Sequence, residues 1–434
     1  MEHVEHAIGH LTGRKYDYVI FGASGFTGQF VVEELARLVV SDNRKRHWAV
    51  AGRSEAKLRD TLRLASENTG IKLNDIPIII ADVKDEDSLL AMAKQARVIL
   101  NCVGPYRFFG EPVVKAAVEG GAHHVDISGE PSYLEGMQLK YDEAAKAKGV
   151  YIVGCCGWDS IPSEMGIEFT REQFAGTLND IETVVELNSG PKGVHIHFGT
   201  FQSLIHGFAN RGDLKVLRKQ LLPKPVPRSS HKLKSRGVLF YHEGANGWCL
   251  PFLGSDKTVA QRTNYYNYHL RDWRPVQVQP YIKLPSLFHA LAFIVWGIFF
   301  GLMASFKTGR DLMEKYPKLF SFGYFSHEGP TREEIRDVTF TTHVFGRGWQ
   351  GKQLKAEEDP AEPPTDNIAC KVSGPDPGYV ATSACLVASA KTILEEASTL
   401  PPGGGVLTPG VAFTKSKHLI EYLRNRGFTF AKLN

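Results

Sequence analysis

The residues best placed to do chemistry lie in a glycine-rich segment, Gly22-Ala-Ser-Gly25-Phe-Thr-Gly28, which follows an apolar run and opens an amphipathic pattern. In such a turn Gly22 permits the tight bend, Gly25 lets the backbone approach a pyrophosphate, and Gly28 lets the next helix pack closely on the strand. Free N–H groups at the helix N-terminus favour that anion, so the segment predicts a dinucleotide site over a ligand-free turn. The residues expected to contact the cofactor here are Gly22, Ser24, Gly25, Phe26, Thr27 and Gly28.

The end of the next apolar run indicates which dinucleotide is expected. That run closes with Ala51-Gly-Arg53-Ser54, at the point where an NAD enzyme usually has an aspartate or glutamate. Arg53 and Ser54 would pair with a 2′-phosphate through charge-assisted hydrogen bonds, whereas a carboxylate would repel it. NADP is therefore the expected cofactor, with NAD as the alternative. For Arg53 the alternative is a solvated charge at the start of a helix.

Further cofactor contacts are expected where the third and fourth apolar runs end, because ligands sit at the carboxyl ends of parallel strands. Asp82 follows the third run and is expected on the adenine side. Asn101, Gly104 and Pro105 follow the fourth run and are expected to line the cofactor. Tyr106, the next residue, would face the nicotinamide half.

Hydride transfer needs little from a protein beyond positioning and a proton donor or oxyanion stabiliser beside the acceptor. The catalytic candidates are Tyr106, Asp126 at the end of the fifth run, and Asp159 after the sixth. Each has an alternative role, which is pocket packing for the tyrosine and helix capping for the carboxylates. The chain lacks the Tyr-x-x-x-Lys pattern of short-chain dehydrogenases and the Gly-x-Ser-x-Gly elbow of hydrolases. Neither class is therefore expected.

Two histidines, His195 and His197, alternate along a predicted strand and would share one face. No third ligand is spaced with them, and tetrahedral metal sites need at least three protein ligands. We therefore expect core or surface histidines and no metal site.

These residues need a frame that brings strand ends together. Up to about residue 157, short apolar runs alternate with helical patterns, which predicts a parallel sheet with helices on both faces. The predicted strands are Tyr18–Gly22, Trp48–Ala51, Ile76–Ala81, Val98–Val103, His124–Ile127 and Val150–Gly154. The predicted helices are Gln29–Val40, Ser54–Asn68, Glu86–Ala96, Glu111–Glu119 and Tyr133–Lys148. This is the pattern of a doubly wound Rossmann domain.

Beyond residue 157 the segments alternate over longer stretches, which predicts an α+β domain with a mostly antiparallel sheet. Its expected strands are Asp180–Asn188, Val194–Gly199, Asp337–Gly346 and Ile368–Ser373. We therefore expect an α/β protein with a Rossmann domain over residues 1–157 and a substrate or dimerisation domain over residues 158–378. Within the second domain, residues 211–237 are expected to form a basic loop, of which 223–237 has the composition of an exposed loop or a flexible insertion.

Bulk composition limits the classes of function. The net charge of +4 over 434 residues is too small to indicate a nucleic-acid partner. The six cysteines show no C-x-x-C pair and no spacing typical of secreted domains, which indicates a reducing compartment. The opening Met-Glu-His-Val-Glu is acidic and no apolar region follows it, so we expect no secretory or transit peptide.

One apolar run, residues 287–306, carries no formal charge and has about the length of a membrane span. Gly297 and Gly301 in it have the G-x-x-x-G spacing that permits close helix contact in lipid. A single crossing would separate strands that we expect in one domain, and basic residues flank the run on both sides. We therefore expect a monotopic helix or hairpin on a cytosol-facing membrane or lipid-droplet surface. The alternative is a buried helix or a dimer contact.

Together these motifs resemble the saccharopine dehydrogenase family. The matching stretches are residues 22–28, 51–54, 101–106, 124–130, 156–163 and 374–379. The resemblance covers nearly the whole chain. It implies a Rossmann domain, an α+β domain whose sheet is completed late in the sequence, and a segment over residues 379–434 that packs back near the cofactor.

The resemblance implies hydride chemistry and leaves the acceptor open. Saccharopine dehydrogenases act on an amino-acid conjugate, whereas bacterial relatives with similar N-terminal motifs resemble trans-acting enoyl reductases of glycolipid synthesis. We therefore expect an NADP-dependent oxidoreductase with a small-molecule or lipid substrate. The alternatives are an amino-acid dehydrogenase and a non-catalytic dinucleotide-binding protein of lipid droplets or membranes. The sequence also leaves open whether the chain forms a homodimer.

Overall fold

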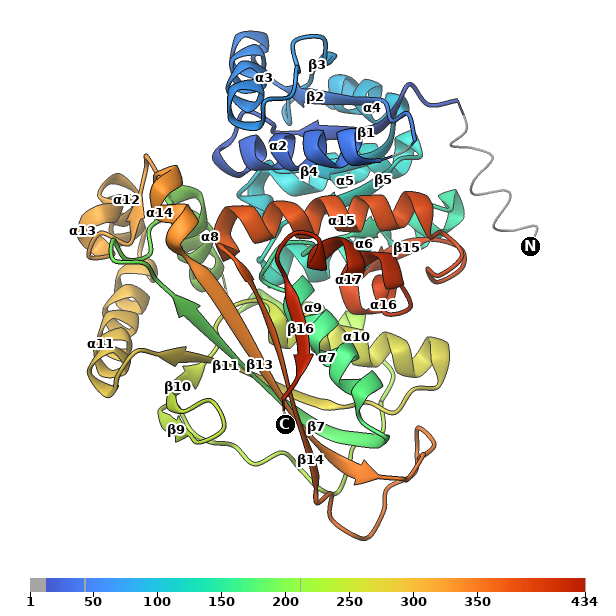
Figure 1. The fold of residues 1–434 in the computed structure, drawn as a ribbon, viewed down its shortest axis with the longest axis vertical. Helices are drawn as coiled ribbons and strands as arrows, with labels where there is room; N and C mark the ends of the chain where they lie inside the picture. Colours follow the sequence, from blue (N-terminus) through green and yellow to red (C-terminus); the bar gives the residue numbers. More distant parts are fainter. Residues whose placement is uncertain (1–12, 43, 211, 434) are drawn as a thin grey trace. The chain divides into compact units, whose positions relative to one another are not determined.

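The computed structural model describes residues 13–42, 44–210 and 212–433 (Figure 1). The acidic opening residues and Arg211, on which two of the expectations draw, lie outside the described residues. The chain forms two units. The first unit comprises Met1–Trp158, Asp213–Leu217 and Gly378–Leu423, and the second comprises Asp159–Gly212, Arg218–Pro377 and Arg424–Asn434.

The first unit is built on a seven-stranded sheet in the order β15-β6-β5-β4-β1-β2-β3. All neighbouring strands are parallel. The strands are β1 (Tyr16–Phe21), β2 (Trp48–Gly52), β3 (Ile78–Ile80), β4 (Ala96–Asn101), β5 (His123–Asp126), β6 (Tyr151–Val153) and β15 (Gly405–Leu407). The order reverses between β1 and β4, which is the switch point where doubly wound folds bind ligands. The predicted Rossmann fold is confirmed, and β15 adds a strand that the sequence did not indicate.

Helices cover both faces of this sheet. They are α2 (Phe26–Ser41), α3 (Glu55–Thr69), α4 (Glu86–Gln95), α5 (Tyr106–Gly120), α6 (Pro131–Lys148), α15 (Thr382–Glu395), α16 (Pro409–Phe413) and α17 (Lys417–Arg424). Helix α2 contacts α3 and α15, while α5 contacts α4 and α6, which groups these helices on opposite faces. Their ends follow local chemistry: Ser54 caps α3 by accepting a hydrogen bond from the backbone N–H of Lys57, and α3 ends at the left-handed Gly70.

The second unit contains a seven-stranded sheet in the order β16-β14-β13-β7-β11-β10-β9. Its strands are β7 (Gly176–Asn188), β9 (Phe240–His242), β10 (Gly247–Pro251), β11 (Gln277–Leu284), β13 (Thr339–Gln350), β14 (Asp366–Pro375) and β16 (Thr429–Lys432). Strands β7 and β11 are parallel, and every other neighbouring pair is antiparallel. The predicted mostly antiparallel sheet is confirmed.

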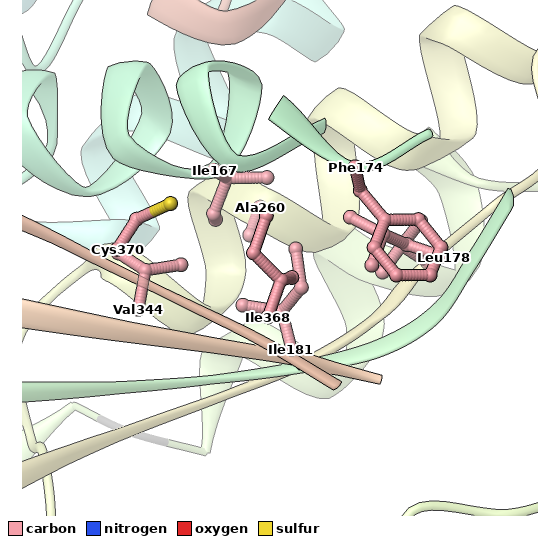
Figure 2. Packing of buried hydrophobic residues seen from close by; sticks show 9 residues of the cluster. Ile167, Phe174, Leu178, Ile181, Ala260, Val344, Ile368 and Cys370 are labelled. Atoms are coloured by element: carbon pink, nitrogen blue, oxygen red, sulfur yellow. The ribbon is translucent and has the colours of Figure 1, made fainter. Parts of the chain in front are cut away.

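One face of this second sheet packs against two helices, α7 (Ile161–Gln173) and α10 (Asp256–Arg271). Figure 2 shows the buried cluster between them, in which side chains of both helices meet residues of β7, β13 and β14. The residues of this cluster are Ile167, Phe174, Leu178, Ile181, Ala260, Val276, Val344, Ile368 and Cys370. Alternation along the strands sends these apolar side chains inward and their polar neighbours outward.

A smaller helical group of the second unit has a core of its own. It comprises α8 (Phe198–Ala209), α11 (Leu287–Ala304), α12 (Lys307–Lys315), α13 (Pro317–Phe320) and the short parallel pair β8 (Ile196–His197) and β12 (Phe325–Ser326). The buried residues are Phe201, Ile205, Phe300, Ala304, Met313 and Phe325. The remaining helices of the described residues are α9 (Asp213–Leu221), α14 (Arg332–Asp337) and the π-helix η1 (Pro377–Ala381).

The predicted strand over residues 194–199 is wrong for most of its length. Only Ile196 and His197 pair as a strand, and α8 begins at Phe198. The His197 side chain caps this helix by accepting a hydrogen bond from the backbone N–H of Gly199 at 3.1 Å. The apolar residues that follow have helical spacing, since Phe201 and Ile205 are both fully buried four residues apart.

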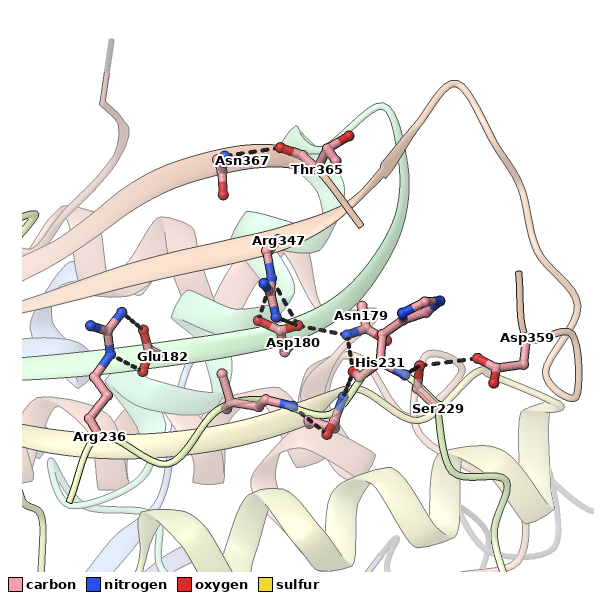
Figure 3. Close-up of polar contacts among 12 residues, drawn as sticks. Asn179, Asp180, Glu182, Ser229, His231, Arg236, Arg347, Asp359, Thr365 and Asn367 are labelled. Atoms are coloured by element: carbon pink, nitrogen blue, oxygen red, sulfur yellow. Dashed lines mark hydrogen bonds and ion pairs between the residues drawn. The ribbon is translucent and has the colours of Figure 1, made fainter. Parts of the chain in front are cut away.

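Residues 223–237 form a loop without helix or strand, which agrees with the first of the two expected forms, and side chains of the second unit contact its later part, residues 228–237 (the strap) (Figure 3). The carbonyl of His231 accepts hydrogen bonds from the side-chain amides of Asn179 (2.8 Å) and Gln277 (3.0 Å). Arg236 makes a bidentate contact with Glu182, with both N···O distances at 2.7 Å. The segment is mostly exposed, and the buried Asn179 and Glu182 of β7 find hydrogen-bond partners in the strap.

The segment over residues 379–434 divides between the two units. Its first part forms α15, which contacts α2, β4 and β5, and β15, which pairs with β6. Its last strand, β16, pairs with β14 in the second sheet. Within the expected C-terminal segment, α15 and β15 thus belong to the first unit, whereas β16 belongs to the sheet of the second.

Candidate functional site

The glycine-rich segment forms the turn between β1 and α2, and two of its glycines cannot carry a side chain. Gly22 has φ of +82°, and a Cβ atom there would lie 2.6 Å from Val103 Cγ2 at the end of β4. A Cβ atom on Gly28 would lie 2.2 Å from the carbonyl oxygen of Gly22. The backbone N–H of Gly25 donates to that same carbonyl at 2.9 Å. The turn is therefore closed tightly on itself and on the neighbouring strand.

The third glycine lies on the open side of the turn. Gly25 is exposed, is the N-cap of α2 and has no side chain to cap the helix. The first N–H groups of a helix lack partners within the helix and favour an anion. Ser24 and Thr27 flank this position and are only partly buried. The turn thus fits a dinucleotide pyrophosphate, in the arrangement that the sequence predicts.

Arg53 follows β2 and is exposed beside the start of α3. Among the described residues, none holds its guanidinium in a hydrogen bond or an ion pair. The Ser54 hydroxyl oxygen caps α3, accepting from the N–H of Lys57 at 3.4 Å. A charge that is left unpaired at a helix N-terminus, next to a hydroxyl, fits the 2′-phosphate that distinguishes NADP from NAD.

Replacement of Arg53 by alanine is expected to raise the Kd for NADPH by roughly tenfold to a hundredfold and the Kd for NADH by less than about twofold, because only NADPH carries the 2′-phosphate. Titration of cofactor fluorescence measures both constants. Arg59→Ala is the matched control, since Arg59 lies in the first turns of α3, which follows Arg53, and is paired with Glu55. An equal loss of affinity for both cofactors in Arg53→Ala would contradict the role of this residue.

The remaining predicted cofactor contacts lie at the carboxyl ends of β3 and β4. Asp82 is partly buried, and its Oδ1 accepts from the N–H of Lys84 at 3.0 Å, which fixes the turn before α4. Asn101 is fully buried, and its Oδ1 accepts from the N–H of Val103 at 3.0 Å. Gly104 is exposed and precedes the buried Pro105, the N-cap of α5. The structure therefore places Gly104 where a ligand can reach it and gives Asn101 a supporting position.

Two of the three catalytic candidates, Tyr106 and Asp126, lie together in one buried polar cluster at the ends of β4 and β5. The Tyr106 hydroxyl donates to the carbonyl of Asn101 at 2.8 Å, and its ring packs on that of Tyr133 at 5.4 Å. Asp126 accepts from the Tyr133 hydroxyl at 2.9 Å and from the N–H groups of Ser128 and Cys155. The hydrogen bonds of these groups join the loops that follow β4, β5 and β6 to one another.

Burial raises the pKa of Asp126 from its ordinary 3.8 to about 6, against the hydrogen bonds from Ser128, Cys155 and Tyr133, which lower it. The neighbouring His124 is fully buried, and burial lowers its pKa to about 3. His124 is therefore neutral at physiological pH, and its approach of 3.9 Å to Asp126 is not an ion pair. Burial thus brings the pKa of the Asp126 carboxyl close to neutral pH.

Asp126→Asn is expected to remove a pH dependence of stability. With a raised pKa in the folded protein, Asp126 favours folding fully below about pH 4, and this contribution is lost as the pH rises to about 6. Relative to the variant, the wild type should lose about 3 kcal/mol of unfolding free energy over that window. Urea unfolding of both proteins from pH 4 to 7 measures it, and parallel profiles would contradict the assignment.

Sequence reasoning missed a positioning contact in this cluster. The Glu130 carboxylate accepts from the backbone N–H groups of Tyr106 (2.9 Å) and Arg107 (3.0 Å), so it caps α5 from the loop after β5. Tyr133 was also missed, because a tyrosine in the first turn of a predicted helix carries no signal for its distant partner Asp126. The only available signal was the grouping of Asp126, Ser128 and Glu130 at one strand end.

The third catalytic candidate, Asp159, belongs to the second unit. Its Oδ2 accepts from the N–H (3.1 Å) and the hydroxyl (2.7 Å) of Ser255, the N-cap of α10. Burial raises the pKa of Asp159, and burial together with the charge of Asp159 raises the pKa of the nearby Asp256 further. Asp159 therefore ties the start of α7 to the start of α10 within the second unit.

The two histidines of the predicted alternating pair have separate roles. His197 caps α8, and His195 lies 3.1 Å from Glu334. Within the described part of the chain, no group of three or more His, Cys, Asp or Glu side chains is placed to hold a metal ion.

Comparison with known proteins identifies the family. The model of the saccharopine dehydrogenase NADP-binding domain matches residues 18–153, which contain the glycine-rich turn and Arg53. The human saccharopine dehydrogenase-like oxidoreductase is 45% identical over 97% of this chain and 98% of its own. The chain belongs to the saccharopine dehydrogenase-like oxidoreductase family. The predicted resemblance and the predicted cofactor, NADP, are confirmed.

Two further similarities bear on fold and location. A Caenorhabditis elegans relative, named lipid droplet localized protein, is 40% identical over 96% of this chain and 98% of its own. The structure of apo saccharopine dehydrogenase (L-Glu forming) from Saccharomyces cerevisiae matches 96% of this chain and all of that chain, with a TM-score of 0.55 and 12% identity. At that identity the second match shows a shared fold alone. The family is thus an oxidoreductase family with an NADP-binding domain.

Proposed function

We propose that the protein is an NADP-dependent oxidoreductase that transfers hydride between the cofactor and a hydrophobic, lipid-derived substrate at the surface of a lipid droplet or membrane. When bound, NADP supplies the hydride chemistry. The protein supplies the turn at Gly22–Gly28 for the pyrophosphate and Arg53 for the 2′-phosphate. The observation that carries the location and the substrate class is the exposed apolar face of α11.

Helix α11 is long and apolar enough to cross a membrane by length and composition. Along one side, Phe288, Leu291, Val295, Ile298 and Leu302 are spaced three and four residues apart and are between 48% and 74% exposed. These positions form a single stripe on the helix. A soluble protein rarely leaves so large a continuous apolar surface uncovered, unless the surface binds something.

The opposite side of α11 packs against the rest of the helical group. Phe300 and Ala304 are buried in the core of the helical group, and a Cβ atom on Gly301 would lie 2.8 Å from the Phe208 ring of α8. Trp296 donates from its indole N–H to the carbonyl of Phe320 at 2.8 Å. Gly301 therefore serves packing within the chain, and nothing lies within 4 Å of a Cβ atom on Gly297. A helix anchored on one side in this way suits lying in a lipid surface and does not suit crossing it.

A second exposed segment extends the stripe. Leu319 is 71% exposed and Phe322 is 80% exposed, and they flank Phe320, whose ring stacks on that of Phe299 of α11. We define the lipid-facing patch by the residues Phe288, Leu291, Val295, Ile298, Leu302, Leu319 and Phe322. Two of the flanking lysines are already paired, Lys307 with Asp311 and Lys318 with Glu328. The attraction to lipid therefore rests mainly on apolar contact.

For the catalytic step we propose that the cluster of Tyr106, Asp126, Tyr133 and Glu130 keeps the loops at the nicotinamide edge in place. This role is supported by their burial and by hydrogen bonds that face other protein groups. Asp159 is proposed to position the loop that precedes α7 in the same way.

The test is incubation of the purified full chain with NADPH and fractionated cell lipids, with loss of cofactor fluorescence as the readout and parallel assays with NADH and with saccharopine. We expect oxidation of NADPH in a lipid fraction, with a matching mass change of two hydrogens in one lipid. Turnover of saccharopine, or tight binding of NADPH with no oxidation by any fraction, would overturn the proposal.

A further inference from the structure

The segment that joins β14 to α15 is a π-helix, Pro377–Ala381. Such helices are rare and occur frequently at functional sites, because the wider turn costs stability. Within it Gly378 is exposed and Val380 is 38% exposed, whereas Tyr379 between them is only 4% exposed. The segment therefore directs one large side chain into the first unit.

Tyr379 packs on the helix that the glycine-rich turn opens. Its ring lies 4.8 Å from that of Phe26 in an edge-on arrangement and 5.4 Å from that of Phe30. Phe26 and Phe30 are one helical turn apart and contact each other at 6.0 Å. Because Phe26 directly follows Gly25, Tyr379 holds the residue next to the one that would meet the pyrophosphate.

The first residue of α15, Thr382, directly follows the π-helix and holds a second loop at this edge of the sheet. The Thr382 hydroxyl oxygen accepts a hydrogen bond from the backbone N–H of Trp158 at 3.1 Å. A Cβ atom on Gly157 would lie 3.3 Å from the Thr382 methyl group, so the loop after β6 fits closely here. Tyr379 and Thr382 thus hold in place the loops that follow β1 and β6.

From these contacts we infer that Tyr379 is a positioning residue for NADP, which holds Phe26 so that the turn at Gly22–Gly28 keeps the shape that admits the pyrophosphate. A turn that is ordered before binding avoids the entropy cost of being ordered by the ligand. The cofactor's 2′-phosphate takes no part in this, so NADPH and NADH depend on Tyr379 equally. The inference concerns cofactor binding and is independent of the substrate.

The experiment compares Tyr379→Ala, Tyr379→Phe and a control, Tyr151→Ala. Tyr151 is buried too, packs on the His123 ring at 5.4 Å and donates to the carbonyl of Pro401, away from the glycine-rich turn. Tyr379→Ala is expected to raise the Kd of both NADPH and NADH about tenfold, because two aromatic contacts are lost. In Tyr379→Phe both Kd values are expected to stay within about twofold of wild type, since the ring contacts with Phe26 and Phe30 remain.

Hydrogen exchange of the cofactor-free proteins separates positioning from general loss of stability. Amides 22–28 are expected to exchange faster in Tyr379→Ala and at the wild-type rate in Tyr151→Ala, even where the control melts at a lower temperature. In the wild type, NADPH is expected to slow exchange at 377–381 as well, because coupling between two sites is reciprocal. Unchanged affinity in Tyr379→Ala, equal weakening in Tyr151→Ala, or no NADPH effect at 377–381 would overturn the inference. The wild-type measurement decides the matter if Tyr379→Ala does not fold.

Discussion

Gly28→Val is expected to abolish measurable NADPH binding and to lower the melting temperature of the cofactor-free protein. Any β-carbon at residue 28 would stand 2.2 Å from the Gly22 carbonyl oxygen, and that oxygen is backbone, so the turn itself must move. The overpacking should cost about 3 kcal/mol, or roughly 10 °C in melting temperature for a unit of this size. Differential scanning fluorimetry and cofactor titration measure the two effects.

Gly25→Ala tests the turn from its open side. Gly25 is exposed, and its Cβ atom would meet only the Gly22 carbonyl oxygen, at 3.2 Å, so the fold should lose less than about 1 kcal/mol. The new methyl group stands where the backbone must approach the pyrophosphate, and NADPH affinity should fall on the order of a hundredfold. Gly28→Val thus changes stability and binding together, whereas Gly25→Ala changes binding alone.

A third glycine supplies the matched control. Gly136 lies inside α6, and nothing lies within 4 Å of a Cβ atom built there. Gly136→Ala should therefore stabilise the protein by about 0.5–1 kcal/mol and leave NADPH binding unchanged. NADPH binding that survives Gly28→Val, or that falls equally in Gly136→Ala, would show that the turn does not hold the cofactor.

The second large effect is expected at the lipid-facing patch. The double variant Val295→Asp and Ile298→Asp should lose most of its binding to phospholipid-coated oil droplets, by roughly a hundredfold in partition coefficient. Each side chain is two-thirds or more exposed in the fold, with 67% for Val295 and 70% for Ile298, so neither contributes much to the core. In lipid each would bury apolar surface worth about 1–2 kcal/mol, which a carboxylate would forfeit.

The matched control places the same charges on isolated apolar residues of the same unit. Leu253 is 79% exposed and Leu270 is 58% exposed, and both lie outside the lipid-facing patch. Leu253→Asp with Leu270→Asp should float with the droplets as the wild type does. Droplet flotation followed by quantitative blotting measures both variants, and circular dichroism checks that both are folded. A patch variant that floats normally would remove α11 from any role in lipid binding.

Prediction from sequence succeeded where the determining interactions are local. The strand, turn and helix around Gly22–Gly28 appear as expected, because a tight turn and hydrophobic periodicity both depend on residues that are close together in the sequence. Arg53 stands out as a candidate for the same reason, since it directly follows a strand whose end is visible in the sequence. The alternation of strands and helices likewise indicated a parallel, doubly wound sheet, because a helix must cross between successive parallel strands.

Prediction failed where a partner lies far along the chain. Strand β15 is three residues long and forms only because the edge of β6 is open to it, 250 residues earlier in the sequence. The strap has the serine- and lysine-rich composition of an exposed loop, and its anchors Asn179, Glu182 and Gln277 lie on strands of the second sheet, far from it in the sequence. Val194–Gly199 alternates like a strand. A helix begins there instead, because a ring nitrogen of His197 caps α8 and the apolar residues that follow have helical spacing.

The candidate site shows the same division. Local sequence was enough to propose the cofactor turn and Arg53, whereas the contacts that hold their surroundings could not be predicted. Tyr133 meets Asp126 from the next helix, Glu130 reaches back to cap α5, and Tyr379 returns from the far end of the chain to contact Phe26. Only the fold brings these residues together, and single-sequence patterns carry no record of it.

The late return of the chain to the first unit also has a consequence during protein synthesis. When the ribosome has made residues 13–158, the sheet still lacks β15, and the face later covered by α15 is bare. Helix α15 is buried along almost its whole length, so the nascent sheet must expose a matching apolar surface while more than two hundred further residues are added. The NADP-binding unit therefore matures only after translation has passed Leu407, and until then its open strand edge needs the protection that chaperones give to incomplete sheets.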